Sequence, residues 1–142
     1  MKFGVDERIN DSYIVKSYGI GYIEIFSPTP LILGGGESKN FQEKRKQIIR
    51  HSVILTRDKV REWTPRTFDE LKEGYFEVFL DINPEVILLG TGNNLFFPPP
   101  SLFKKLFDHG IGVEFMSTAA ACRTYNILVN ESRRVAAALL IK

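Results

Sequence analysis

The sequence has few residues of the kinds that build disulfides, metal sites or membrane spans. It contains one cysteine and two histidines, so an internal disulfide is impossible and no spacing of a zinc site is present. No apolar run approaches the ~20 residues that a membrane-spanning helix needs. We therefore expect no metal, no cofactor and no transmembrane segment.

The N-terminal stretch also lacks the features of a targeting signal. "MKFGVDERINDS" is polar and carries three acidic residues, unlike the apolar core of a secretory signal or an acid-poor mitochondrial presequence. A single cysteine agrees with a reducing compartment. These observations predict a cytoplasmic, bacterial protein.

Composition indicates one globular domain. A chain of 142 residues with 44% hydrophobic and 25% charged residues can bury a sizeable core without disulfides or metal. The formal net charge of +2 is too small to indicate a nucleic-acid partner. We expect a single domain over residues 1–142.

The front half has the pattern of antiparallel hairpins. "SYIVKSYGIGYIEIF" and "HSVILTRDKVREW" each place two runs of β-branched and aromatic residues around a turn. Between them, residues 27–50 contain "SPTP", "GGG" and many charges, which predicts a long, mobile surface excursion.

The back half alternates between helical and strand patterns. The spacing of apolar residues predicts helices at 67–80, 101–110 and 119–132, and strands at 85–90, 111–116 and 133–142. Thr67 and Glu70 form a capping box for the first helix, and the strand at 111–116 reads as buried on both faces. This alternation favours three parallel strands with right-handed crossovers.

Two strand ends supply the candidate ligand cleft. Gly90, Thr91 and Gly92 offer backbone N–H groups, while Ser117 and Thr118 open a helix whose positive end attracts anions. If the two strands are neighbours, these loops share one cleft and could hold a small anion. In the alternative interpretation, Ser117 only caps its helix and the glycines only turn the chain.

The same loop does not match a dinucleotide fingerprint. "GTGNNL" lacks the third glycine of the motif, and three prolines without N–H groups come before the next helix. A sharp turn is the favoured interpretation.

Cys122 can be interpreted in two ways. A position near the start of a helix, beside Arg123, favours a reactive thiolate. The alanines around Cys122 favour a buried, structural thiol instead, and His51 and His109 are far away in the sequence. We expect Cys122 to be buried and slow to react, and we assign no catalytic residue.

Three polar residues follow on the same helix. Arg123, Tyr125 and Asn126 either brace neighbouring strands through hydrogen bonds or face the candidate cleft. The sequence leaves both roles open.

The segments "PEVILLGTG", "GIGVEFMSTAAACRTYNIL" and "ESRRVAAALL" resemble the Mth938-domain-like family, small α/β proteins of largely unknown activity. This family includes the mitochondrial respiratory complex I assembly factor 3. The resemblance implies a single α/β domain with a three-layer β and β/α arrangement, built from N-terminal hairpins and a C-terminal αβαβαβ half. The chain departs from the family pattern at Ser117, where the family usually has Asp, and at Ala119, where it often has Gly.

Two functional hypotheses remain. The first is a non-enzymatic binding or assembly protein with protein partners, linked by the resemblance to respiratory complex I assembly. It is favoured because no complete catalytic set is present. The second is a small-molecule or nucleotide-binding enzyme that uses the cleft formed by residues 90–92 and 117–126.

Overall fold

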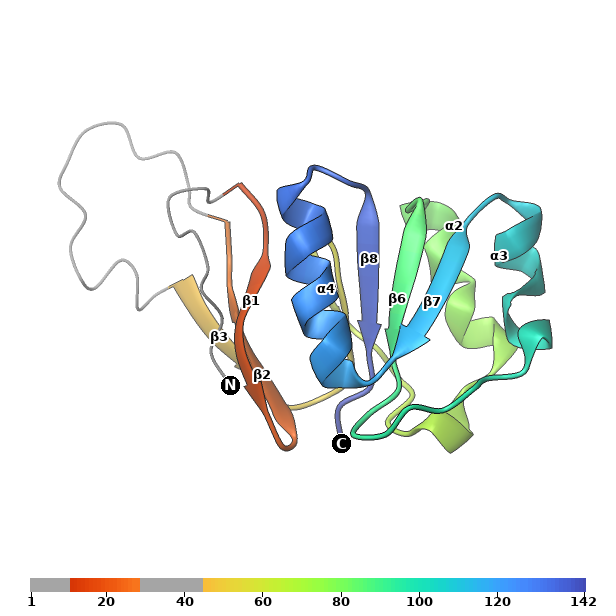
Figure 1. Cartoon of the computed structure of the whole chain (residues 1–142), viewed down its shortest axis with the longest axis horizontal. Helices are drawn as coiled ribbons and strands as arrows, with labels where there is room; N and C mark the ends of the chain where they lie inside the picture. Colours follow the sequence, from red (N-terminus) through yellow and green to blue (C-terminus); the bar gives the residue numbers. More distant parts are fainter. Residues whose placement is uncertain (1–10, 29–44) are drawn as a thin grey trace, which may run out of the picture.

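The computed structural model describes residues 11–28 and 45–142, which form two sheets packed with helices (Figure 1). The predicted excursion at 27–50 therefore lies largely outside the described residues.

The smaller sheet is antiparallel, with strand order β1-β2-β3. It contains β1 (Ile14–Gly19), β2 (Tyr22–Phe26) and β3 (Lys46–Ile49). The first predicted hairpin is confirmed, since β1 pairs with β2 across a turn in which Gly21 has a φ of +77°. The strand β3 was not predicted. It lies inside the supposed excursion, where a single residue, Ile49, reaches the core and anchors the strand.

The larger sheet has five strands in the order β5-β4-β8-β6-β7. They are β4 (Val53–Leu55), β5 (Val60–Glu62), β6 (Val86–Gly90), β7 (Gly112–Met116) and β8 (Val135–Leu139). The second hairpin, β4–β5, and the three parallel strands β8, β6 and β7 are confirmed. The predicted burial of β7 is wrong, because β7 is an edge strand that leaves Gly112 and Glu114 exposed.

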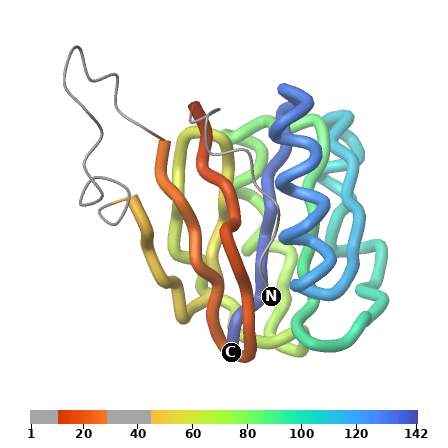
Figure 2. Tube along the Cα trace, turned by 60° about the vertical axis from the view of Figure 1, so that its left-hand side comes forward, coloured from red at the N-terminus to blue at the C-terminus, as the bar shows by residue number. Residues whose placement is uncertain are grey.

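Side chains on the two faces of the larger sheet enter different cores. Helix α4 (Thr118–Asn130) and the smaller sheet cover one face, where Leu88 and Ala137 are buried. Helices α2 (Val78–Ile82) and α3 (Lys104–Asp108) cover the other face (Figures 1 and 2). The result is a single α/β domain of three layers, as predicted.

The helix predicted at 67–80 is broken into three pieces. Two 3-10 helices, Phe68–Glu70 and Glu73–Phe76, precede α2, and Leu71 between them is extended. The expected capping box is also wrong, since the side chain of Thr67 makes no capping hydrogen bond. The tertiary structure explains the break: Phe76 is buried in the core, and Nε1 of Trp63 donates to the carbonyl of Tyr75 at 3.1 Å.

The next helical segment follows the prediction more closely. A 3-10 turn at Pro100–Phe103 continues into α3, and Gly110 lies beyond its end with a φ of +75°.

Candidate functional site

The end of β6 lies directly against the start of α4. A Cβ placed on Gly90 would lie 2.9 Å from the Cα of Thr118, closer than real Cβ contacts. Only glycine permits this approach. Gly92, two residues later, has a φ of +96°, a conformation that glycine adopts without strain.

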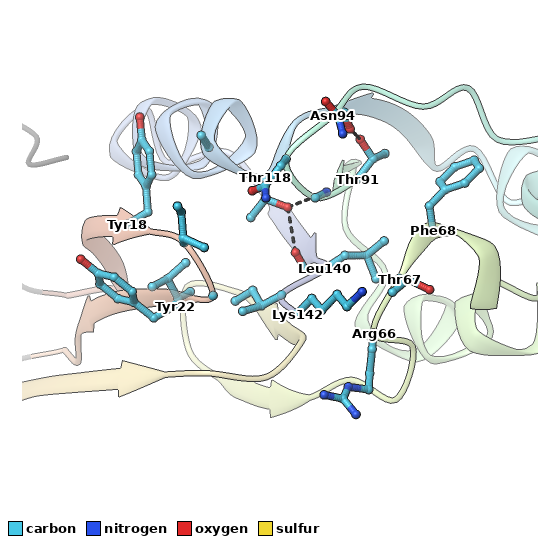
Figure 3. Close-up of a pocket in the computed structure, with 18 of the residues that line it drawn as sticks. Tyr18, Tyr22, Arg66, Thr67, Phe68, Thr91, Asn94, Thr118, Leu140 and Lys142 are labelled. Atoms are coloured by element: carbon cyan, nitrogen blue, oxygen red, sulfur yellow. Dashed lines mark hydrogen bonds between the residues drawn. The ribbon is translucent and has the colours of Figure 1, made fainter.

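Thr118 joins three chain segments at this point (Figure 3). Its Oγ1 accepts a hydrogen bond from the N–H of Gly92 and donates to the carbonyl of Leu140, both at 2.9 Å. Its own N–H donates to the carbonyl of Gly92 at 2.9 Å. The loop after β6, the start of α4 and the residue after β8 are therefore held as one unit.

The hydroxyl groups of Ser117 and Thr91 also form hydrogen bonds within these loops. Ser117 is the N-cap of α4 and accepts from the N–H of Ala120 at 3.2 Å, as the capping interpretation predicted. The buried Thr91 Oγ1 donates to the carbonyl of Asn94 at 2.6 Å. Several donors that the anion prediction relied on are thus already bound within the chain, so an anion among them would have to replace these hydrogen bonds.

A cavity of about 820 Å³ opens beside this junction (Figure 3). Five parts of the chain line it: residues 18–23, 66–68, 91–94 with 96, 118–119 and 140–142. Of the predicted cleft residues, Thr91, Gly92 and Thr118 line the cavity. Gly90, Ser117 and the polar residues farther along α4 are not part of the lining.

The lining is apolar and basic. Phe68 and Phe96 stack with ring centroids 4.8 Å apart and planes 24° apart. Arg66 and Lys142 contribute positive charge, and none of the described lining residues is Asp, Glu, His or Cys. No local sequence pattern connects Arg66, Phe68 and Lys142 with the "GTG" loop, so their place in the cavity lining could not be predicted.

Cys122 lies away from the cavity and is completely buried. Burial raises the pKa of its thiol to about 12, although the positive charge of Arg123 acts in the opposite direction. The predicted burial is confirmed, and a thiol with such a raised pKa is almost entirely protonated near neutral pH.

The three polar residues after Cys122 bind β1 and the residue before it. Arg123 donates to the hydroxyl of Tyr18 at 2.6 Å, and the hydroxyl of Tyr125 donates to the carbonyl of Tyr13 at 2.7 Å. Asn126 binds both backbone groups of Val15. These contacts correspond to the bracing role, in which one side of α4 holds the smaller sheet in place.

Comparison with known proteins gives the family. Residues 36–140 match the family described as "protein of unknown function (DUF498/DUF598)". The chain belongs to this DUF498/DUF598 family.

Three relatives place this DUF498/DUF598 chain among known proteins. It is 36% identical to the "13 kDa major membrane protein" of Francisella tularensis over 63% of this chain and 75% of the relative. It is 25% identical to the bovine "NADH dehydrogenase [ubiquinone] 1 alpha subcomplex assembly factor 3" over 92% of this chain and 71% of that protein. A solution NMR structure of a Mth938-like domain from Bordetella pertussis has a TM-score of 0.71 and 26% identity, covering 99% of this chain and 92% of that one. The resemblance noted in the sequence is confirmed.

We find neither a metal-binding cluster nor a membrane-spanning helix in the part of this DUF498/DUF598 chain that the structure describes. Residues 11–28 and 45–142 contain no group of three His, Cys, Asp or Glu residues that could hold a metal ion. No helix in these ranges has the length and apolar content needed to cross a membrane. The cytoplasmic location stays a prediction.

Proposed function

We propose that this chain is a non-enzymatic binding protein that helps assemble respiratory complex I by contacting a protein subunit of that complex. The observation that supports a non-enzymatic role is the chemistry of the cavity lining. Its described residues include no Asp, Glu, His or Cys, which are the side chains that most often transfer protons or attack substrates near neutral pH. The thiol of Cys122 is buried elsewhere.

An exposed apolar surface supports a protein partner. We define the apolar rim as Ile20, Leu95, Phe96 and Phe97, whose residues are 89%, 51%, 43% and 74% exposed. Ile20 and Phe96 line the same cavity, so the tip of the β1–β2 turn and the loop after β6 contribute to one surface. Clusters of large apolar side chains that are exposed to solvent often mark interaction sites, whereas single exposed apolar residues are common on protein surfaces.

The identity of the partner rests on the relatives. The bovine relative is named as an assembly factor of NADH dehydrogenase and aligns with 92% of this chain. A protein with an apolar groove or an apolar helix face is the partner that best fits the apolar rim, since interface cores are enriched in aromatic residues.

The test compares two exposed apolar residues. Phe97 belongs to the rim, whereas Ile127 is 58% exposed on α4 and does not line the cavity. Deletion of the gene for this chain in its own organism should lower the amount of assembled complex I on native gels. It should also lower the NADH:ubiquinone reductase activity of membranes. The wild type and Ile127→Ser should restore both. Phe97→Ser should bind its partner about tenfold more weakly, because truncating an aromatic residue that is buried in an interface typically costs about 1–2 kcal/mol or more.

The proposal fails if cells without the chain contain normal amounts of active complex I. The role of the rim fails if Phe97→Ser, folded as judged by circular dichroism, restores assembly as fully as Ile127→Ser.

A small-molecule ligand is the second candidate, and the cavity is the observation that favours it. Its volume of about 820 Å³ falls within the roughly 300–1,000 Å³ typical of ligand pockets. The lining supports binding more readily than catalysis, for the reason given above.

A further inference from the structure

We infer that the cavity beside Thr118 binds a small organic anion with a flat apolar body, whose charged group is bound by Lys142 and whose body lies against Phe68 and Phe96. This inference concerns a ligand site and goes beyond the assembly role proposed above.

The charge of the cavity favours an anion. Lys142 and Arg66 both line it, both are exposed, and neither side chain forms an ion pair within the described residues. The described lining holds no carboxylate side chain that could neutralise them. A carboxylate or phosphate entering the cavity would therefore meet positive charge without displacing an internal partner.

Lys142 is better placed than Arg66 for direct contact. In Figure 3 the Lys142 side chain extends toward Thr67, another residue of the lining, whereas the Arg66 side chain points away from it. We therefore assign the direct contact to Lys142. Arg66 contributes positive potential at the cavity margin.

The aromatic residues divide the cavity into two ends. At one end, the faces of Tyr18 and Tyr22 are approached by the guanidinium groups of Arg123 and Arg50, at 5.9 and 5.8 Å from the ring centroids. At the other end, Phe68 and Phe96 stack on each other and no described cation lies over them. The phenylalanine end is therefore the better surface for a flat apolar group.

Two buried residues near the C-terminal end of the described chain also line the cavity. Leu140 and Ile141 are buried at 3% and 5% exposure and contribute apolar surface. Thr118 Oγ1 is engaged with Gly92 and Leu140, so it is not a primary anchor for the ligand. A ligand with an apolar body and a charged head group fits a lining that combines apolar residues with the basic Lys142 and Arg66.

Matched naphthalene probes test the inference. The full chain, labelled with ¹⁵N, is titrated with 1-naphthyl phosphate, 1-naphthoate and neutral 1-naphthalenemethanol, and amide shifts are followed by NMR. Both anions should bind about tenfold or more tightly than the alcohol, as expected for one charge-assisted contact. The shifted amides should cluster at residues 18–23, 66–68, 91–96 and 140–142. The difference between the phosphate and the carboxylate probe identifies the preferred head group.

Charge variants separate direct contact from general attraction. Lys142→Gln should weaken 1-naphthyl phosphate about tenfold, Lys142→Arg should retain most of the binding, and Arg66→Gln should have a smaller effect. Lys104→Gln, which removes an exposed lysine on α3 outside the lining, should change nothing.

Several outcomes would overturn the inference: no binding by any probe, equal binding of the neutral alcohol, shifted amides outside the cavity, or unchanged affinity in Lys142→Gln. Phe97→Ser should leave probe binding intact, because Phe97 does not line the cavity. Loss of the ligand site and loss of the assembly role are thus distinguished.

Discussion

Asn126 is expected to be the main polar connection between α4 and β1. Its Nδ2 donates to the carbonyl of Val15 at 2.7 Å, and its Oδ1 accepts from the N–H of Val15 at 2.9 Å. The pairing of β1 with β2 is irregular between Val15 and Ser17. A side-chain amide therefore binds both backbone groups of a completely buried residue at the edge of this irregularity.

The cost of Asn126→Ala can be worked out from these two bonds. Each contributes about 1 kcal/mol net, and a buried backbone group left without a partner costs about 1–3 kcal/mol. The better helix propensity of alanine returns about 0.5 kcal/mol. Both backbone groups of Val15 lose this partner, so two such costs less the propensity gain give an expected fall in the free energy of unfolding of about 1.5–5.5 kcal/mol.

Urea unfolding followed by circular dichroism measures this change. Asn130→Ala is the matched control, since Asn130 is exposed at the end of the same helix and its side chain forms no hydrogen bond within residues 11–28 and 45–142. Asn126→Asp should also be destabilised at neutral pH and should recover partly below about pH 4, where a protonated carboxyl group can donate to Val15. If Asn126→Ala and Asn130→Ala agree within about 0.5 kcal/mol, the bracing role is refuted.

Three further predictions follow from buried or crowded positions. Cys122 should react with a thiol reagent at neutral pH at least about 100-fold more slowly in the native protein than in urea, and equal rates would contradict its burial. Burial raises the pKa of Cys122 in the folded state to about 12. The stability that this shift contributes is complete below the unfolded-state pKa of about 8.5. Above that pH the free energy of unfolding falls by about 1.4 kcal/mol per pH unit. Cys122→Ala should remove this slope in urea titrations between about pH 8 and 10.5. Gly90→Ala should destabilise by about 2 kcal/mol through its clash with Thr118, whereas Gly74→Ala, with nothing within 4 Å of the added Cβ, should not; equal stabilities would refute the close contact.

Features that depend on neighbouring residues could be predicted from the sequence. Runs of β-branched residues around Gly21 predicted the first hairpin, and the buried apolar runs predicted β6 and β8. Ser117 and Thr118 were both candidate caps of α4, because capping needs only a hydroxyl two or three residues before an N–H, and Ser117 is the one that caps it. The alternation of helices and strands then favoured three parallel strands, which the structure contains.

Features that depend on distant residues were missed or misread. The apolar spacing at 67–80 is helical, but Trp63 and the core draw its residues into two 3-10 turns before α2. The strand β3 has little apolar pattern and exists because β2 offers it a partner. The apolar run of β7 could not show that β7 is the last strand of its sheet.

The candidate site likewise has one feature that could be predicted from the sequence and one that could not. The close contact between the "GTG" loop and the start of α4 was foreseeable, because loops after neighbouring parallel strands end at the same edge of a sheet. The cavity itself was not, since Arg66, Phe68 and Lys142 meet the tip of the β1–β2 turn only in the folded chain. Local periodicity reports which face of an element is apolar. Which charges stay unpaired, and which aromatic rings face one another, is decided by contacts between residues far apart in the sequence.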